Sequence, residues 1–279
     1  MNFNTMKTSI LPLLIFLFLA GHVFGQKTKI VEGLRFTEGP AISPDGVLYF
    51  SDVPALRIYK YENDELSVFL EDTGGANGLY FDDNNNVIAC AGRVRKLINI
   101  TPDKEVKTLV DSYKGKKLNS PNDLWIHPDG KIYFTDPRYG NTDNLELDGM
   151  HVYFFVRETE KLVRVTNDLV RPNGIIGTPD GKVLYVVDQG EEKTYRYYIK
   201  PDGTLAGKQL FAEVGVDGMT LDKKENVYIT HQKTVQCYSP KGELLKTFPF
   251  EAMTTNVVFH EDGLFVTTQG GEVFRVELK

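Results

Sequence analysis

Residues 119–136 read NSPNDLWIHPDGKIYFTD. From Leu124 to Phe134 the stretch consists of two short apolar runs around a Pro-Asp-Gly turn, in which proline presets φ and glycine accepts a positive φ. This pattern predicts a β-hairpin. The polar residues before it, NSPND, could either cap the first strand or present a side-chain oxygen to a ligand.

The same hairpin pattern recurs six times along the chain. Aligned on the polar residue before each hairpin, the copies begin at Glu38, Asn77, Asn122, Asn173, Asp217 and Asn256. The steps between them are 39 to 51 residues, which leaves room for about four strands in each unit. No stretch shows the three-and-four spacing of an amphipathic helix. The sequence therefore predicts an all-β, six-bladed β-propeller with four-stranded blades, and the rival architectures are a seven-bladed propeller and a β-helix.

The start of the chain predicts a targeting segment. A single lysine precedes an apolar run from Ile10 to Ala20, which is too short to span a bilayer comfortably and is typical of a secretory signal. We expect residues 1–25 to be a signal peptide, cleaved near Gly25-Gln26, with an uncleaved anchor as the alternative. Residues 26–279 are then one propeller domain, secreted or periplasmic, in which residues 27–34 pair with the carboxyl-terminal VFRVELK and close the ring.

Charge and cysteine content limit the partners. The 32 basic and 38 acidic residues give a formal net charge of −6, and no basic run is present to neutralise phosphates. Nucleic acid is therefore not an expected partner, nor is a membrane after signal cleavage, and the oligomeric state stays open. Cys90 and Cys237 fall in units two and five, on opposite sides of the ring. Because a disulfide needs Cα atoms within about 7 Å, we expect buried free thiols, with an intermolecular bridge as the alternative.

The six polar starting residues are expected to converge at one mouth of the propeller, because the first strand of each unit lies nearest the axis. They are two carboxylates and four amides, with no His or Cys. Hard cations such as Ca²⁺ take six to eight oxygen ligands, whereas zinc prefers nitrogen and sulfur. The composition thus favours a central Ca²⁺ site, with Mg²⁺, Mn²⁺ or Zn²⁺ as substitutes. Taken singly, Asn77 and Asn256 are better explained as caps that satisfy local backbone donors.

A longer segment, YKGKKLNSPNDLWIHPDGKIYFTDPRYG at residues 113–140, resembles the signature of bacterial gluconolactonases. These belong to the wider gluconolactonase and regucalcin family of six-bladed propellers. The likeness extends over nearly the whole chain after residue 25, through FTEGP at Phe36, RPNG at Arg171 and VDGM at Val216. The order and spacing of these motifs are more specific than any one of them alone.

The resemblance implies roles for four of the ring residues. It implies a catalytic divalent metal, usually calcium, held by Glu38, Asn173 and Asp217. Asn122 is similar to a position that lies against metal or substrate, so we count it among both the metal-binding and the catalytic residues. Asp217 matches the residue that acts as base or nucleophile in the family.

The chain also departs from the family pattern in places that affect the choice of substrate. Ser120 stands where regucalcin-like members carry an arginine that grips the sugar, and Arg138 stands where microbial relatives tend to have a proline. Residues 141–148 match no pattern of the family and are expected to form part of a rim loop. Asn77, Arg138 and Tyr139 are the candidate substrate contacts.

Together these features predict a metal-dependent hydrolase that acts on carboxylic ester bonds and opens sugar lactones such as glucono-lactone. The metal would polarise the lactone carbonyl, and Asp217 would either take a proton from water or attack the carbonyl carbon directly. One alternative is a phosphotriester or aryl-ester hydrolase on the same metal site. Another is a non-catalytic ligand-binding propeller with structural calcium, since a propeller fold by itself settles no function.

Overall fold

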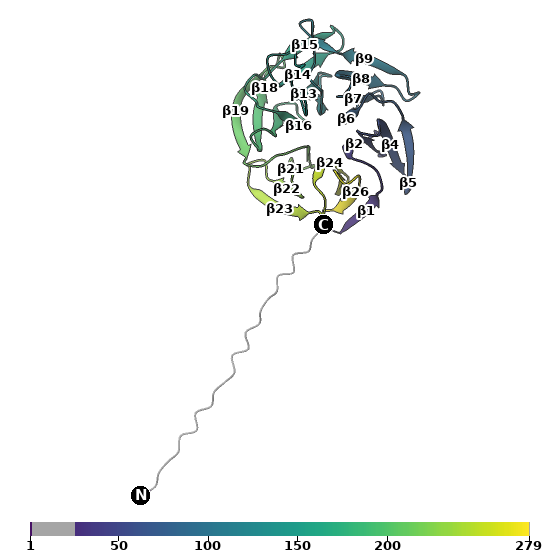
Figure 1. The fold of residues 1–279 in the computed structure, drawn as a ribbon. Helices are drawn as coiled ribbons and strands as arrows, with labels where there is room; N and C mark the ends of the chain where they lie inside the picture. Colours follow the sequence, from purple (N-terminus) through teal and green to yellow (C-terminus); the bar gives the residue numbers. More distant parts are fainter. Residues whose placement is uncertain (2–25, 279) are drawn as a thin grey trace.

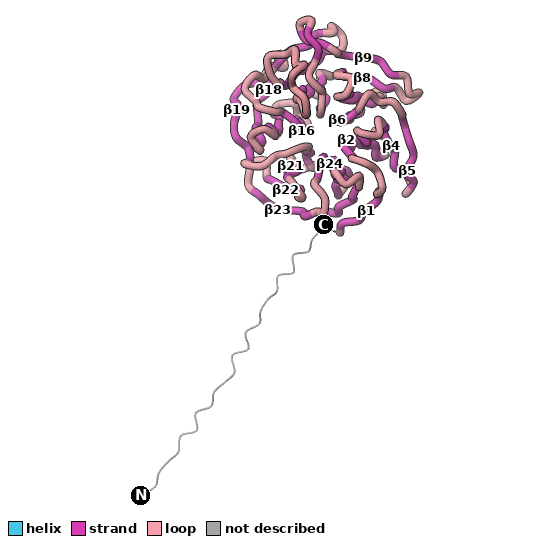
Figure 2. Tube along the Cα trace, viewed as in Figure 1, coloured by secondary structure: helices cyan, strands magenta, loops and turns pink. Residues whose placement is uncertain are grey.

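The computed structural model describes residue 1 and residues 26–278, so the expected signal peptide lies almost wholly outside the described residues. In residues 26–278 the strands form six antiparallel four-stranded sheets, arranged as a ring around a central axis (Figure 1). Figure 2 shows only strands and loops in this part of the chain. None of these residues forms a helix that is long and apolar enough to cross a membrane. The six-bladed propeller predicted from the hairpin repeat is confirmed.

Each blade runs outward from the axis in chain order. Blades one to three contain β2 (Thr37–Ile42), β3 (Leu48–Asp52), β4 (Arg57–Glu62) and β5 (Glu65–Leu70), then β6 (Ala76–Phe81), β7 (Val87–Ala91), β8 (Lys96–Ile100) and β9 (Val106–Val110), then β12 (Leu124–Ile126), β13 (Ile132–Asp136), β14 (His151–Val156) and β15 (Lys161–Arg164). Blades four and five contain β16 (Pro172–Gly177), β17 (Val183–Asp188), β18 (Lys193–Ile199) and β19 (Leu205–Ala212), then β20 (Met219–Leu221), β21 (Val227–His231), β22 (Thr234–Tyr238) and β23 (Leu244–Pro249).

The sixth blade joins the two ends of the described chain. It contains β24 (Thr254–His260), β25 (Gly263–Thr268), β26 (Val273–Glu277) and, as its outer strand, β1 (Lys27–Val31). Antiparallel pairing of β1 with β26 places Lys27 opposite Val276 and Lys29 opposite Phe274. The predicted closure of the ring is therefore confirmed, and the purple and yellow ends of the ribbon meet in Figure 1.

The apolar core lies between neighbouring blades, and the alternation of side chains along each strand builds it. On β13, Phe134 packs with Leu97 of blade two, whereas the preceding residue, Tyr133, packs with Leu184 of blade four. Successive side chains of a strand point to opposite faces, so every blade contributes to two core layers. Both aromatic residues are fully buried, and burial of one such side chain stabilises a fold by about 1.5–3 kcal/mol.

The two cysteines are part of these layers. Cys90 lies on β7 in the core between blades two and three, and Cys237 lies on β22 in the core between blades five and six. Both are buried free thiols, as predicted.

One end of the axis carries the longest connections. The inner strands β2, β6, β12, β16, β20 and β24 all begin at this end, which we call the funnel end. A two-stranded hairpin, β10 (Ser112–Tyr113) and β11 (Lys116–Lys117), and the loop of residues 137–150 both belong to blade three at this end. They contact each other, because the backbone N–H of Lys117 donates to the Glu146 carboxylate at 2.9 Å.

Candidate metal-dependent active site

The first half of NSPND anchors the chain to its own blade. The Asp136 carboxylate, at the end of β13, accepts hydrogen bonds from the backbone N–H of Asn119 at 2.8 Å and of Ser120 at 2.7 Å. The Asn119 side-chain amide donates to the carbonyls of Asp136 and Gly149, which ties down the end of the 137–150 loop. Burial raises the pKa of Asp136 to about 7, although these backbone N–H groups oppose the shift. The Asp136 carboxylate thus fixes the chain just before Asn122 and in this way holds Asn122 at the mouth of the axis.

The same device recurs in two other blades. Asp188 accepts from the backbone N–H of Val170 and of Arg171, both at 2.8 Å, and so holds the chain that leads to Asn173. Asp52 accepts from the backbone N–H of Arg35 at 3.0 Å, three residues before Glu38. The aspartate at the end of each of these hairpins therefore has a structural role, because it holds the chain that leads to the polar residue at the start of the same hairpin.

Glu38 and Asp217 are the two carboxylates of the ring, and the structure brings them together. Glu38 is buried, with an exposed fraction of 2%, and its Oε2 accepts from the backbone N–H of Gly39 at 3.0 Å. Burial raises the pKa of Glu38 to about 8, and burial together with the charge of Glu38 raises the pKa of Asp217 well above its ordinary value. Within residues 26–278, neither carboxylate is paired with a Lys or Arg side chain. The pair therefore lacks a compensating positive charge.

Three asparagines complete the ring of oxygen-bearing side chains at this level. Asn122 and Asn173 are buried, with exposed fractions of 7% and 4%. The side-chain nitrogen of Asn173 donates to the Tyr139 hydroxyl at 2.7 Å and to the Val216 carbonyl at 3.4 Å, which leaves its side-chain oxygen available as a ligand. The buried side-chain oxygen of Asn77 has no hydrogen-bond partner, an unusual state for a buried acceptor.

The pairing in blade six corrects one of the predicted ring positions. On β13, the carbonyl of Thr135 accepts the N–H of Asn122, and its N–H donates to the carbonyl of Asp123. The Thr135 hydroxyl accepts the N–H of Asp123. In blade six, the hydroxyl of the equivalent Thr267 on β25 accepts the N–H of Asn256 in the same way. Asn256 is therefore equivalent to Asp123, and Thr255 takes the place of Asn122. The prediction that Asn256 starts the sixth unit was wrong by one residue, because two polar residues follow each other there.

Asp123 and Asn256 form a second tier directly beneath the carboxylate pair, and we call them the plug. Blades three and six face each other across the ring, and the Asn256 amide donates to Asp123 Oδ2 at 3.4 Å. Asp123 Oδ1 accepts the backbone N–H of Leu124 at 2.9 Å, and the Asn256 side-chain oxygen accepts that of Val257 at 2.8 Å. Burial raises the pKa of Asp123 to about 7. The tunnel along the axis is thus closed by two polar side chains.

Glycine makes room for this plug. The equivalent position is glycine in the other four blades, as in EGP, NGL, NGI and DGM. A Cβ on Gly218 would lie 1.9 Å from the Asn256 side-chain oxygen, and one on Gly78 would lie 2.5 Å from an Asp123 oxygen. Both distances are far below van der Waals contact.

We expect Gly218→Ala to destabilise the protein by about 1–3 kcal/mol, since overpacking of a closed site has this size. The expelled Asn256 side chain should also disturb Glu38, with which it hydrogen-bonds. Urea unfolding monitored by circular dichroism measures the change. Gly270→Ala is the matched control, because its Cβ would meet nothing closer than 3.3 Å, and unfolding midpoints that are equal for the two variants would contradict the plug geometry.

Tyr139 and Arg171 lie against each other at the funnel end, next to Asn173. The Tyr139 side chain is 42% exposed, while its hydroxyl contacts Asn173, and burial together with the charges of Asp217 and Glu38 raises its pKa well above the ordinary value. The Arg171 guanidinium lies over the Tyr139 ring at 5.6 Å from its centroid and donates to the Gln189 side chain at 3.2 Å. Arg138 donates instead to Asn144 within the 137–150 loop, so its side chain is engaged at the rim.

The donor set at this site suits a hard cation. Among residues 26–278, no group of three His, Cys, Asp or Glu side chains converges in a way that could hold a metal, so a cation here must also take amide oxygens. Two uncompensated carboxylates, two buried amides and the unpartnered oxygen of Asn77 provide such a set. It contains only oxygen ligands, as Ca²⁺ prefers.

Sequence reasoning brought Glu38, Asn122, Asn173 and Asp217 to one mouth and missed Asp123. The signal was present, because NSPND has Asp at the position where four other units have Gly. In those four units this position has no side chain, so the Asp123 side chain projects into the axis.

Comparisons with known proteins show which proteins share this sequence pattern and fold. The model of the SMP-30/gluconolactonase/LRE-like region matches residues 36–270. A gluconolactonase from Zymomonas mobilis is 29% identical, over 90% of this chain and 80% of its own. The solved structure of a gluconolactonase from Xanthomonas campestris aligns with a TM-score of 0.86 at 28% identity, covering 91% of this chain and 90% of that one. A regucalcin from Agrobacterium tumefaciens, described as a calcium-binding protein, shares the fold with a TM-score of 0.76 at 18% identity, covering 91% and 93%.

Proposed function

The chain belongs to the SMP-30/gluconolactonase/LRE-like family and is an ester hydrolase of the lactonase type, and we propose that it opens sugar lactones such as glucono-lactone with the help of a bound Ca²⁺. The observation that supports this is the pair of carboxylates at the mouth of the axis, buried Glu38 and half-buried Asp217, without a cationic partner in the described chain. Such a pair is poorly stable by itself, since burial and like charge both oppose ionisation.

In this proposal Glu38, Asn122, Asn173 and Asp217 hold the cation. The bound cation supplies a Lewis acid that polarises the lactone carbonyl. Calcium is proposed ahead of Mg²⁺, Mn²⁺ and Zn²⁺ because the set has only oxygen donors, and because the regucalcin that shares this fold is described as calcium-binding.

The side chains of the ring supply the rest of the chemistry. Asp217 lies at the rim of the ring and takes a proton from the attacking water on its carboxylate oxygen. Asn173 is fixed by Tyr139 and Val216, so its oxygen is oriented before substrate binds. The Asn122 amide orients the oxygen on which negative charge develops, where a fixed dipole is most effective in a site that excludes water. The acyl C–O bond of the lactone then breaks, the proton held by Asp217 passes to the leaving ring oxygen, and the resulting hydroxy acid dissociates.

The funnel wall favours a sugar over an apolar ester. The exposed ring of Tyr139, the Arg171 guanidinium and the Asn77 amide present stacking and hydrogen-bonding groups rather than an aliphatic surface. Sugar rings bind to such surfaces through their apolar faces and hydroxyls. Arg138 is proposed as a rim residue that acts through the 137–150 loop, because its guanidinium already engages Asn144.

We also propose that the protein is exported. The leader-like composition of residues 1–25 supports export to the periplasm or the medium. Sequencing the amino terminus of the mature protein from each cell fraction tests this directly. A cytosolic protein that retains Met1 would refute it.

A substrate panel tests the function. One calcium-loaded sample is assayed against aldonolactones, aryl esters and phosphotriesters under the same conditions. We expect aldonolactones to have the highest kcat/KM. Preference for phosphotriesters or aryl esters would identify the ester hydrolase, and no turnover of any class would leave a ligand-binding propeller.

Asn122→Ala is expected to have a moderate effect, with a clear rise in KM and a loss of kcat of about tenfold, since it removes an orienting amide and leaves both carboxylates in place. Steady-state kinetics at saturating Ca²⁺ separate the two parameters. Asn99→Ala is the matched control, because Asn99 lies on β8, the third strand of blade two, away from the axis. An unchanged KM in Asn122→Ala would remove Asn122 from the substrate site.

A further inference from the structure

Beneath the plug, the axis widens into a second chamber that opens at the other end of the propeller. This lower cavity has a volume of about 860 Å³ and is lined by the plug residues Asp123 and Asn256, but not by Glu38, Asn122, Asn173 or Asp217. It is therefore separate from the proposed active site. Its size lies within the range of small-molecule binding sites, which is about 300–1,000 Å³.

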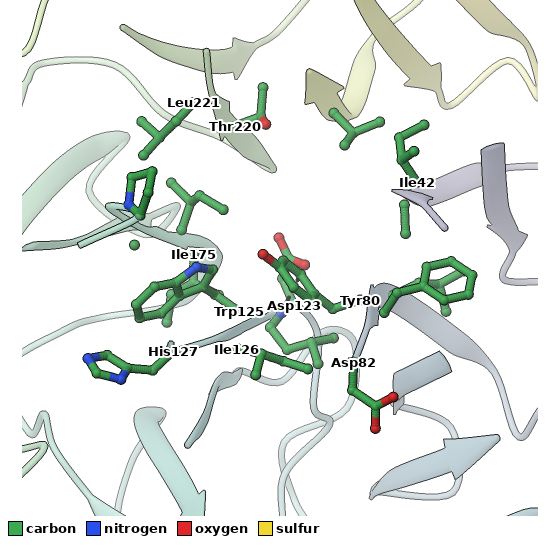
Figure 3. Close-up of a pocket in the computed structure, with 18 of the residues that line it drawn as sticks. Ile42, Tyr80, Asp82, Asp123, Trp125, Ile126, His127, Ile175, Thr220 and Leu221 are labelled. Carbon is green, nitrogen blue, oxygen red and sulfur yellow. Dashed lines mark hydrogen bonds between the residues drawn. The ribbon is translucent and has the colours of Figure 1, made fainter. Parts of the chain in front are cut away.

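Apolar and aromatic side chains of the inner strands line part of the lower cavity, and most of them are half-buried, whereas Trp125 is largely buried in the core. Ile42, Ile126 and Leu221 come from three different blades, and aromatic rings come from Tyr80 and Trp125. Figure 3 shows Asp123 near the centre of this group, with its carboxylate directed into the space that Ile175, Leu221 and Ile42 surround. Apolar side chains with a small number of charged groups among them are typical of a site that orients an organic ligand.

The charges of the lower cavity are predominantly negative. Its lining carries five carboxylates and one guanidinium. That guanidinium, Arg157, is already neutralised by Asp82 at 2.6 Å, across blades two and three. The remaining carboxylates are Asp123 at the floor and Asp83, Glu158 and Asp222 at the rim, and none of these four forms an ion pair within residues 26–278.

From the cavity, its aromatic wall and its charge, we propose that the lower cavity binds a small organic ammonium ion with an aromatic or branched apolar body. The ammonium group approaches the Asp123 carboxylate, and the body packs against Ile42, Leu221 and the rings of Tyr80 and Trp125. Aromatic faces attract organic cations, and a carboxylate in a partly dry chamber attracts them more strongly than it would in water. The rim carboxylates steer the cation toward the mouth. The site is independent of lactone hydrolysis and does not rest on the proposed function.

Trp125 provides a specific readout, because it is the single tryptophan of the chain and lines the lower cavity. Its emission is recorded at pH 8 and constant ionic strength, with excess Ca²⁺ present, while one of three probes of similar shape is added. The probes are phenethylammonium, the neutral phenethyl alcohol and the anionic phenylacetate. We expect saturable changes with phenethylammonium binding at least tenfold more tightly than phenethyl alcohol, and phenylacetate more weakly still. Equal binding of all three, or preference for the anion, would overturn the proposal.

Variants test where the ammonium ion binds in the lower cavity. Asp123→Asn should remove the preference for phenethylammonium over phenethyl alcohol.

Since the Asp123→Asn variant alters the plug and can fail to fold, the rim pair Asp83→Asn with Glu158→Gln is a second test. Both of these side chains are exposed and remote from the proposed metal ligands. The rim pair should weaken phenethylammonium binding roughly two- to fivefold, as partly screened charges do. The control is Glu213→Gln with Glu251→Gln, the same charge change at exposed positions of the funnel end. Equal affinity in the rim and control variants would overturn the assignment.

A competition assay separates this inference from the proposed function. Phenethylammonium should leave the KM for lactone unchanged at concentrations that saturate the Trp125 signal. Competitive inhibition without a change in Trp125 emission would place the cation in the funnel and refute the lower site. If the protein hydrolyses no lactone, the fluorescence titration still decides the inference.

Discussion

Asp217→Asn, assayed with Ca²⁺ in large excess, is expected to lower kcat for lactone hydrolysis by 10²–10⁴-fold, which corresponds to roughly 3–5 kcal/mol of activation free energy. The substitution keeps the shape of the side chain and one oxygen ligand, but removes the basicity that takes the proton from water. It also removes a carboxylate whose pKa is raised by burial and by the charge of Glu38. Thermal stability in calcium should therefore change much less than activity.

Two comparisons make this result specific. Excess Ca²⁺ ensures that weaker metal binding cannot account for the loss, and this is checked by measuring kcat at two calcium concentrations. Asp180→Asn makes the same chemical change in a turn of blade four, where the side chain is about half exposed, and should leave kcat unchanged. Near-normal hydrolysis by Asp217→Asn would show that Asp217 is only a ligand and that the base lies elsewhere.

Removal of calcium is the second large effect. A ligand that binds only the folded state stabilises it by RT ln(1 + [L]/Kd), on the order of 3 kcal/mol at a hundredfold excess over Kd. For a domain of this size that corresponds to a fall in Tm of roughly 5–10 °C. Calorimetry before and after chelation measures it. The control is Glu38→Gln, which should have a smaller calcium-dependent shift because one carboxylate ligand is gone.

The calcium-free protein should also have a distinctive pH dependence. Burial raises the pKa of Glu38 to about 8 from an ordinary value of 4.5, so the folded state holds this proton more tightly than the unfolded chain does. The contribution to stability is fully present below about pH 4.5 and is lost as the pH rises to about 8. The Tm of the calcium-free protein should thus fall between pH 5 and pH 8.5, while the calcium-loaded protein changes little. A calcium-free Tm that rises over this interval would contradict the carboxylate pair.

Much of the fold could be predicted from the sequence, because the propeller repeats one local pattern. Each hairpin has its own turn chemistry, as in Pro128-Asp129-Gly130, and the alternation of buried residues on strands such as β13 follows directly from the sequence. Counting these units was enough to predict six blades and the pairing of β1 with β26. Repetition gives many independent observations of the same local rule.

The parts that failed depend on contacts between blades. Whether Thr255 or Asn256 belongs to the upper tier is decided by the pairing of β24 with β25, since both residues are polar and adjacent. The plug depends on Asp123 meeting a residue 133 positions away, across the axis. Likewise, the contact of Tyr139 with Asn173 joins a rim loop to the next blade. The local sequence pattern does not determine which of these residues meet across blades.

Calcium-dependent lactone hydrolysis is tested most directly by following the hydrolysis of glucono-lactone by the wild-type protein in a pH-stat through removal and return of calcium. The protein is chelated and desalted, its metal content is verified by atomic emission, and Ca²⁺ is then titrated back. We expect hydrolysis above the spontaneous rate to disappear with the metal and to return to its full value as Ca²⁺ saturates one site. Hydrolysis that persists unchanged in verified metal-free protein would contradict it.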